Sequence, residues 1–461
     1  MGLLLAGFLG AMAQAAPTDG RPSVSKKGSL LIFPAVEVRW DGEGNVIQDT
    51  FLSIANDYPA DVYVQFYYVN GDPPLDAVVV DPGEPIGKGD GQEPPKVIEP
   101  AHPGWNKRKC EMLLTCDQPM YLSALTGRPA GVGSFTDLDP GGRPDGEGGR
   151  LVRGYVLAWA VNQSGAEINW NQLAGNATVV HYSLGTAWEY EAYAVRAIAG
   201  EQGSATDGNR GQLLLNGVEY EACQESLLLN FFASGDQDPS RRFVTTPFDT
   251  DLTLMPVQVD LRDENFGPVT THIRLDVWNQ NEFRFASSHR MITCWDQSLL
   301  SGYADPNYFV RQQLQTDVGV ARIDGLANTD CEHFAIPAAL VGVSNRLITF
   351  PAPEGECAAA ASARTLPGDG CEEASILYQP EPVRICGTDG DCDGNGIVNL
   401  GDWRFVAECL GGPNSGSSED CRCADTDGDE DVDLSDVAYF QRKMGNPPSA
   451  GGLQACEDGG D

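Results

Sequence analysis

Basic residues are scarce in this sequence. Its 461 residues contain 30 lysines and arginines against 66 aspartates and glutamates, which gives a formal net charge of −36, and only five histidines. A surface this acidic repels the phosphate backbone of nucleic acids, so we expect no nucleic-acid partner. The charge suits a protein that stays soluble outside the cell or that collects cations.

Familiar catalytic motifs are also missing. The sequence has no His-Glu-x-x-His zinc motif, no Gly-x-Ser-x-Gly nucleophile elbow and no phosphate-binding glycine loop followed by Lys-Ser/Thr. His181 and His272 fall in strand-like runs, where packed or surface roles are expected for them. We therefore predict no catalytic residue, and a non-catalytic protein is the first interpretation.

Long apolar runs are absent beyond the first residues, so we expect no transmembrane segment. Leu3–Met12 is an apolar run too short to cross a bilayer, and the small residues of Ala13-Gln14-Ala15 fit a cleavage site before Ala16. We predict that residues 1–15 are a signal peptide and that the protein is secreted or held at the cell surface. No Lys or Arg precedes the apolar run, which leaves an upstream start open. The alternative to a signal peptide is a buried N-terminal helix.

The 13 cysteines are predicted to form disulfides, because exported proteins fold in an oxidising environment. Their odd number leaves one thiol free or bonded to another molecule. The candidate pairs are Cys110 with Cys116, Cys357 with Cys371, and Cys409 with either Cys421 or Cys423.

The body of the chain is dense in strand and turn signals. It is rich in glycine and proline, and runs of β-branched and aromatic residues alternate with turn residues. Strands at this density, without long alternating helices, favour antiparallel β-sandwiches. We predict one or two sandwich domains, at 28–200 and 211–378, separated by the polar segment Gly200–Gly211. Asn307–Gln315 and Ile336–Val343 are candidates for short helices.

A repeat with a period of 34 residues occupies the C-terminal segment. One twelve-residue loop begins at Asp391 and the second at Asp425, and each has oxygen-bearing side chains at positions 1, 3, 5, 9 and 12. A loop with this spacing surrounds Ca²⁺, which takes roughly six to eight oxygen ligands. The two loops therefore predict two calcium sites; the alternative is an acidic, solvated tail with no bound metal.

Each loop is followed by apolar residues at helical spacing. These are Trp403, Val406 and Leu410 after the first loop, and Val437, Phe440 and Met444 after the second. Both sets end at a glycine in register, Gly411 and Gly445, as helix C-caps would. The residues before each loop are poor helix formers, so each unit is predicted to have only an exiting helix.

A duplicated calcium loop with only its exiting helix resembles the type I dockerin, over about residues 386–446. The resemblance implies a cohesin-type partner. The ligands it implies are Asp391, Asp393, Asn395, the Ile397 carbonyl and Asp402 in the first loop, and Asp425, Asp427, Asp429, the Asp431 carbonyl and Asp436 in the second. Glu430 stands where the sharp turn normally has Gly, so the second site is predicted to be weaker. The positions where many dockerins contact cohesin are Leu400-Gly401 and Leu434-Ser435, instead of Ser/Thr pairs.

The body resembles an uncharacterised exported family of planctomycete-type bacteria. The segments that carry this resemblance are Gly28–Pro34, Asn56–Pro59, Trp278–Glu282 and Cys294–Gln297. It implies secretion. The expected order along the chain is a signal peptide (1–15), two β-sandwiches (28–200 and 211–378), a linker (379–387), the α-helical dockerin-like module (388–446) and a tail (447–461).

Two features of the body bear on glycan chemistry. Glu189 and Glu191 would share one face of a strand, and glycosidases need paired carboxylates, although a solvated strand edge is the alternative. Trp170 and Trp278 are flanked by amides, which suits stacking on a sugar ring or, alternatively, a core tryptophan beside a capped turn. The first hypothesis is a secreted, non-catalytic protein whose β-domains bind a glycan or cell-surface ligand. The alternative is a polysaccharide-active enzyme tethered by its dockerin.

The substitution Asp391→Ala should remove the first calcium site, because position 1 of the loop supplies a carboxylate ligand. A second, weaker site should remain. Calcium titration of the full chain by calorimetry measures both sites. Equal affinity at the two sites of the unmodified protein would contradict the role assigned to Glu430.

Overall fold

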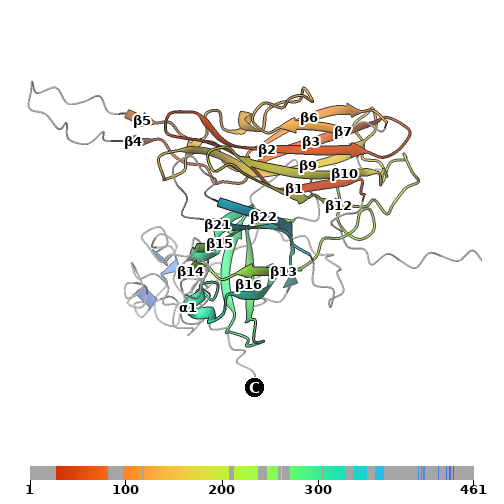
Figure 1. The fold of residues 1–461 in the computed structure, drawn as a ribbon. Helices are drawn as coiled ribbons and strands as arrows, with labels where there is room; N and C mark the ends of the chain where they lie inside the picture. The colour runs from red at the N-terminus through yellow and green to blue at the C-terminus, as the bar shows by residue number, and fades with distance from the viewer. Residues whose placement is uncertain are drawn as a thin grey trace, which may run out of the picture.

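The computed structural model describes most of the body and ten positions of the C-terminal segment. The described residues are 27–80, 97–116, 119–206, 212–236, 247–257, 261, 270–303, 306–327, 336–349 and 359–367, with Trp403, Val406, Ala407, Cys409, Leu410, Ala424, Val432, Asp436, Val437 and Phe440. The structure is mainly β, with several antiparallel sheets, as predicted (Figure 1). The predicted signal peptide, linker and tail lie outside these residues. No described helix is long and apolar enough to cross a membrane.

The first half of the body is one antiparallel sheet that folds over on itself. Its strands are β1 (Leu30–Trp40), β2 (Val46–Asn56), β3 (Val62–Asn70), β6 (Lys107–Leu114), β7 (Pro119–Ser123), β8 (Arg143–Pro144), β9 (Arg150–Val161), β10 (Leu173–His181), β11 (Thr186–Glu191) and β12 (Tyr193–Val195). They run in the order β11-β10-β2-β1-β9-β3-β6, with β12 beside β1, β7 beside β2 and β8 beside β9. A small hairpin, β4 (Val78–Val80) and β5 (Val97–Glu99), and the 3-10 turn η1 (Phe135–Leu138) complete this half. β1 and β2 pair only next to their turn, at Arg39 with Gln48 and Trp40 with Val46.

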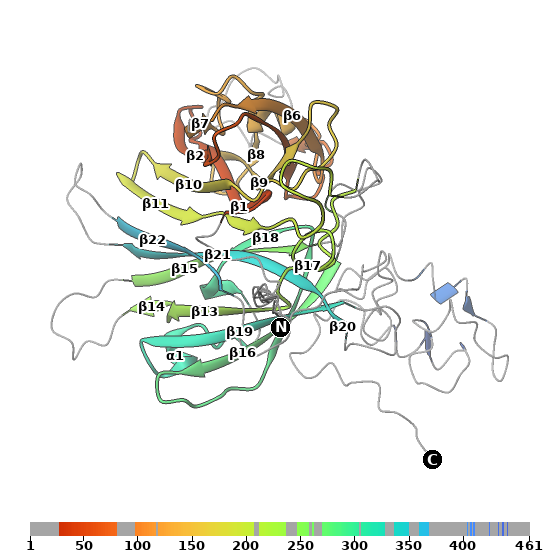
Figure 2. The same cartoon turned by 90° about the vertical axis from the view of Figure 1, so that its right-hand side faces the viewer.

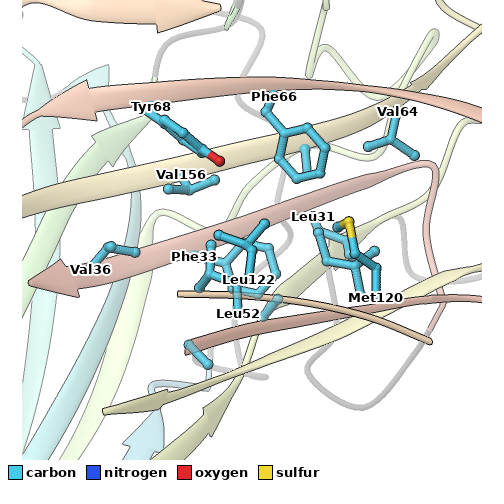
Figure 3. Close-up of a cluster of buried hydrophobic side chains, with 14 of the residues drawn as sticks. Leu31, Phe33, Val36, Leu52, Val64, Phe66, Tyr68, Met120, Leu122 and Val156 are labelled. Atoms are coloured by element: carbon cyan, nitrogen blue, oxygen red, sulfur yellow. The ribbon is translucent and has the colours of Figure 1, made fainter. Parts of the chain in front are cut away.

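The core of this first sandwich lies where the folded-over sheet faces itself. Leu31 and Phe33 of β1 pack with Leu52 of β2 and Leu122 of β7, and all four side chains are buried (Figure 3). Because successive side chains of a strand point to opposite faces, the neighbours of these β1 residues must point away from this core.

The second half of the body is a pair of smaller antiparallel sheets. Their strands are β13 (Ser226–Phe232), β14 (Gly235–Asp236), β15 (Pro247–Val257), β16 (Thr270–Asn279), β17 (Ser288–Thr293), β18 (Asp296–Leu299), β19 (Val318–Ala327), β20 (Ile336–Pro337), β21 (Ala339–Thr349) and β22 (Ala359–Thr365). One sheet runs β13-β19-β16-β17 with β20 beside β19, and the other runs β14-β15-β21-β22 with β18 beside β15. The helical pieces are η2 (Leu300–Gly302) and α1 (Arg311–Leu314).

The two sandwiches share a wide apolar contact. Leu30 and Ile32 of β1 point away from the first core and join a cluster with Met255 of β15 and Val341 of β21. β1 is therefore buried on both faces, and the sandwiches stack face to face (Figure 2). Burial on both faces explains why β1, β3 and β9 contain nearly continuous apolar runs.

Trp295 crosses this contact from the second sandwich to the first. Its side chain is 5% exposed, and its indole nitrogen donates a hydrogen bond of 2.7 Å to the Pro34 carbonyl. The Arg153 guanidinium lies 5.4 Å from the ring centre. Trp295 belongs to the segment Cys294–Gln297, which therefore has a structural role at the contact.

One of the two predicted short helices is wrong. Residues 336–343 form β20 and the start of β21. Leu340 faces the core of the second sandwich, whereas Ala339 and Val341 face the first sandwich. Because both faces of the strand are buried, its sequence lacks the alternation of polar and apolar residues that identifies a strand. Of Asn307–Gln315, only Arg311–Leu314 is helical, and Gln315 ends it in the left-handed conformation.

The predicted disulfide between Cys110 and Cys116 is also wrong, because both residues are free thiols. The chain is extended from Cys110 to the end of β6 at Leu114, a rise of about 13 Å at 3.3 Å per residue, which carries Cys116 away from Cys110. A disulfide requires Cα atoms within about 7 Å. Cys409 is disulfide-bonded. Cys357, Cys371, Cys421 and Cys423 lie outside the described residues.

Replacing Trp295 with Ala should lower the free energy of unfolding by about 3–5 kcal/mol, because it removes a buried aromatic side chain from the contact between the sandwiches. Trp295→Phe keeps most of the packing but leaves the Pro34 carbonyl without its donor, at a cost of about 1–3 kcal/mol. Urea denaturation followed by circular dichroism measures both. Equal losses for the two variants would contradict the packing role of the ring.

Candidate functional site

The predicted calcium module is described at ten positions only. Of the ten predicted ligands, only Asp436 lies among the described residues. It is in α-helical conformation, and its side chain is fully buried. The other nine lie outside the described residues. Asp436 is position 12 of the second loop, where a carboxylate closes the coordination shell of calcium.

The described C-terminal residues include a small apolar cluster. Val406, Ala424, Val432 and Phe440 are buried together, and Val406 and Phe440 are separated by the repeat period of 34 residues. Both are helical, and the Trp403 ring centre lies 5.7 Å from that of Phe440. The apolar positions of the two predicted helices therefore contact each other.

Glu189 and Glu191 lie on β11, at an end of the sheet path, with exposed side chains. Glu189 accepts a hydrogen bond from Asn176 of the neighbouring strand. Burial and then the nearby Glu189 carboxylate raise the pKa of Glu191. Both side chains are exposed, as expected for a solvated strand.

Both amide-flanked tryptophans have structural partners. Trp170 is 6% exposed, donates from its indole nitrogen to Asn56 at 2.9 Å and packs edge-to-face on Tyr58. Trp278 is partly buried under the Arg284 guanidinium. The side chain of Asn279 accepts hydrogen bonds from backbone N–H groups of the following turn. A capped turn beside a packed tryptophan accounts for this pattern.

The two strand histidines have packing roles. His272 is 7% exposed, its ring stacks on His289, and their nitrogens Nε2 and Nδ1 lie 3.1 Å apart. Burial, followed by the charge of His289, lowers the pKa of His272 to about 4. Burial also lowers the pKa of the partly exposed His181. Both rings are therefore mainly neutral at pH 7.

The structure brings together four polar residues that sequence reasoning missed. Glu37 of β1, Asp251 of β15, Gln297 of β18 and Asn345 of β21 line one cavity between the sandwiches, and we name them the seam cluster. They are far apart in sequence, and each lies in a strand-like run that gives no local signal. Only the stacking of the two sandwiches places them together.

The electrostatics of the seam cluster are unbalanced. The Glu37 carboxylate is 6% exposed and accepts from Arg39 Nε at 2.6 Å and from Gln48 Nε2 at 2.7 Å. Asp251 accepts from Gln297 Nε2 at 2.6 Å. Burial, and then the charge of Glu37, raise the pKa of Asp251 to about 6. A second negative charge at this place is therefore costly in the absence of a bound cation.

The cavity at the seam cluster is small. Its free space is about 20 Å³, which holds about one water molecule. A sugar ring does not fit this space. The two carboxylates of the seam cluster are therefore not arranged around a substrate-sized cleft.

No protein-family profile and no curated protein matches this chain. Among solved structures, the CupB6 tip adhesin from Pseudomonas aeruginosa aligns with 76% of this chain and 87% of its own, at 10% identity and a TM-score of 0.09. A TM-score this low does not indicate a shared fold.

Replacing Asp251 with Asn should change how stability depends on pH in protein freed of divalent cations. The folded carboxyl holds its proton up to about pH 6, whereas an ordinary aspartate loses it near 3.8, so the free energy of unfolding of the unmodified protein falls as pH rises between these values. The substitution Asp251→Asn removes this decrease in the free energy of unfolding, because the asparagine side chain does not titrate. The variant should gain on the order of 2 kcal/mol relative to the unmodified protein between pH 4 and pH 7. Urea denaturation at both pH values measures the difference, and parallel pH profiles would contradict it.

Proposed function

We propose that this chain is a secreted calcium-binding protein in which a non-catalytic β-sandwich body is attached through a dockerin-like C-terminal module. The observation that carries the proposal is the buried Asp436 side chain beside an apolar cluster that follows the sequence repeat. Asp436 occupies a position that supplies a calcium ligand in such loops. The apolar cluster is the packing expected between the two helices that follow the loops.

The place of the buried Asp436 side chain in the second predicted loop supports a metal-binding role. Position 12 of a calcium loop supplies a carboxylate to the ion. A small module with so slight a core gains much of its folding free energy from metal binding.

A non-catalytic body fits the chemistry of the described residues. Glu189 and Glu191, the carboxylates considered for glycan hydrolysis, are exposed on a strand at one end of the sheet. The cavity at the seam cluster is too small for a glycan. The tryptophans that could stack on sugars are packed against protein groups. We propose that the body binds a surface or partner at the cell exterior.

The attachment partner implied by the module is a cohesin-type protein. The residues at the positions used for that contact are Leu400-Gly401 and Leu434-Ser435, so the partner surface must accept leucine where it usually meets Ser or Thr. Export agrees with the disulfide at Cys409, because disulfides persist in oxidising compartments.

The substitution Asp436→Asn tests the calcium site directly. It keeps the size of the side chain and removes the charge, so calorimetric titration of the full chain with calcium should lose one binding site. Glu43→Gln, in the exposed turn after β1, is the matched control and should leave the number of sites unchanged. An unchanged number of sites in Asp436→Asn would contradict the proposal.

A further inference from the structure

We infer that the seam cluster binds a hard divalent cation of the calcium class between the two sandwiches. This site lies in the body of the chain, and no part of it comes from the C-terminal repeat. It therefore does not depend on the function proposed for that repeat.

Three neighbouring strands set the geometry of the site. Asp251 of β15 lies opposite Asn345 of β21, and Thr253 lies opposite Gln297 of β18. Residues two apart share a face of a strand, and directly opposite residues have Cβ atoms about 5 Å apart. Asp251, Asn345 and Gln297 therefore converge on one space, and Glu37 lines the same space from β1 of the other sandwich.

Two buried carbonyl oxygens at this space have no hydrogen-bond donor among the described residues. They are Asn345 Oδ1 and Gln297 Oε1, and Asn345 is only 5% exposed. A buried carbonyl without a partner costs about 1–3 kcal/mol. Both atoms are hydrogen-bond acceptors. The partner that they lack is therefore either a cation or a molecule that donates one hydrogen bond to each of them.

The remaining charges favour the cation. The Arg39 guanidinium is hydrogen-bonded to Glu37, and the charges of Arg39 and Arg153 offset only part of the effect that burial and Glu37 have on Asp251. A single water would donate to the two carbonyl oxygens but would add no positive charge beside the Glu37 and Asp251 carboxylates, which share this space. A divalent cation satisfies the carbonyl oxygens and the carboxylate together, and carboxylate and amide oxygens are the ligands that calcium and magnesium prefer.

Size and access also fit an ion. The free space of about 20 Å³ accepts a particle of the size of one water molecule. Asp251 is partly exposed, so an ion can reach the cluster from solvent. The flanking ring of Trp188, which lines the cavity, provides a spectroscopic reporter.

Terbium, a luminescent substitute for calcium, tests the inference in the full chain. Asp391→Ala and Asp425→Ala are combined so that the predicted loops no longer bind. In this background, terbium should still show luminescence excited through tryptophan, and calcium should displace it. Trp188→Phe should abolish the luminescence while leaving a calcium site detectable by calorimetry.

Substitutions in the cluster then separate an ion from a water. Asp251→Asn should weaken calcium binding by at least about tenfold, and Asn345→Asp should strengthen it, because one removes and the other adds a carboxylate ligand. Glu111→Gln, on exposed β6, is the control and should change nothing. Absence of any site in the loop-deficient background, or equal affinity in all three variants, would overturn the inference. Failure of the C-terminal loops alone would leave this body site in the unmodified protein, so the two failures are distinguishable.

Discussion

The structure depends on strands that are buried on both faces. β1, β3 and β9 have the core of the first sandwich on one side and the second sandwich on the other, so every side chain along much of their length is removed from water. Such strands are held in place from two directions. Trp295, which reaches from the second sandwich to the Pro34 carbonyl, joins the halves at this layer.

Stacking two sandwiches on a shared layer has a consequence for polar groups. Where β1 is irregular, between Phe33 and Val36, its pairing with β9 shifts register, and the apolar contact gives way to the seam cluster. Glu37 and Asp251 are drawn into the same enclosed space by the packing around them. Arg39 is hydrogen-bonded to Glu37, and the charges of Arg39 and Arg153 also favour the ionised form of Asp251, yet burial and the charge of Glu37 still raise the pKa of Asp251. The body therefore contains a cation-attracting position that is fixed by the stacking itself.

Local patterns in the sequence predicted the class of fold but not its long-range pairing. Turn residues and β-branched runs predicted antiparallel strands. The 34-residue repeat predicted an apolar set after each loop, and Val406 and Phe440, one from each set, are buried together. Ile336–Val343 was predicted as a helix because burial on both faces removes the alternation that identifies a strand. The seam cluster could not be predicted, because Glu37 and Asp251 meet only after both sandwiches have formed.

Anomalous diffraction from crystals of the full chain grown with terbium in place of calcium tests the central claim most directly. We expect a strong peak beside the buried Asp436 carboxylate, another in the first loop near Asp391 and a third at the seam cluster. All three peaks should disappear when the crystals are grown with a chelator. A map with no peak beside Asp436 would contradict the account of a calcium-binding C-terminal module.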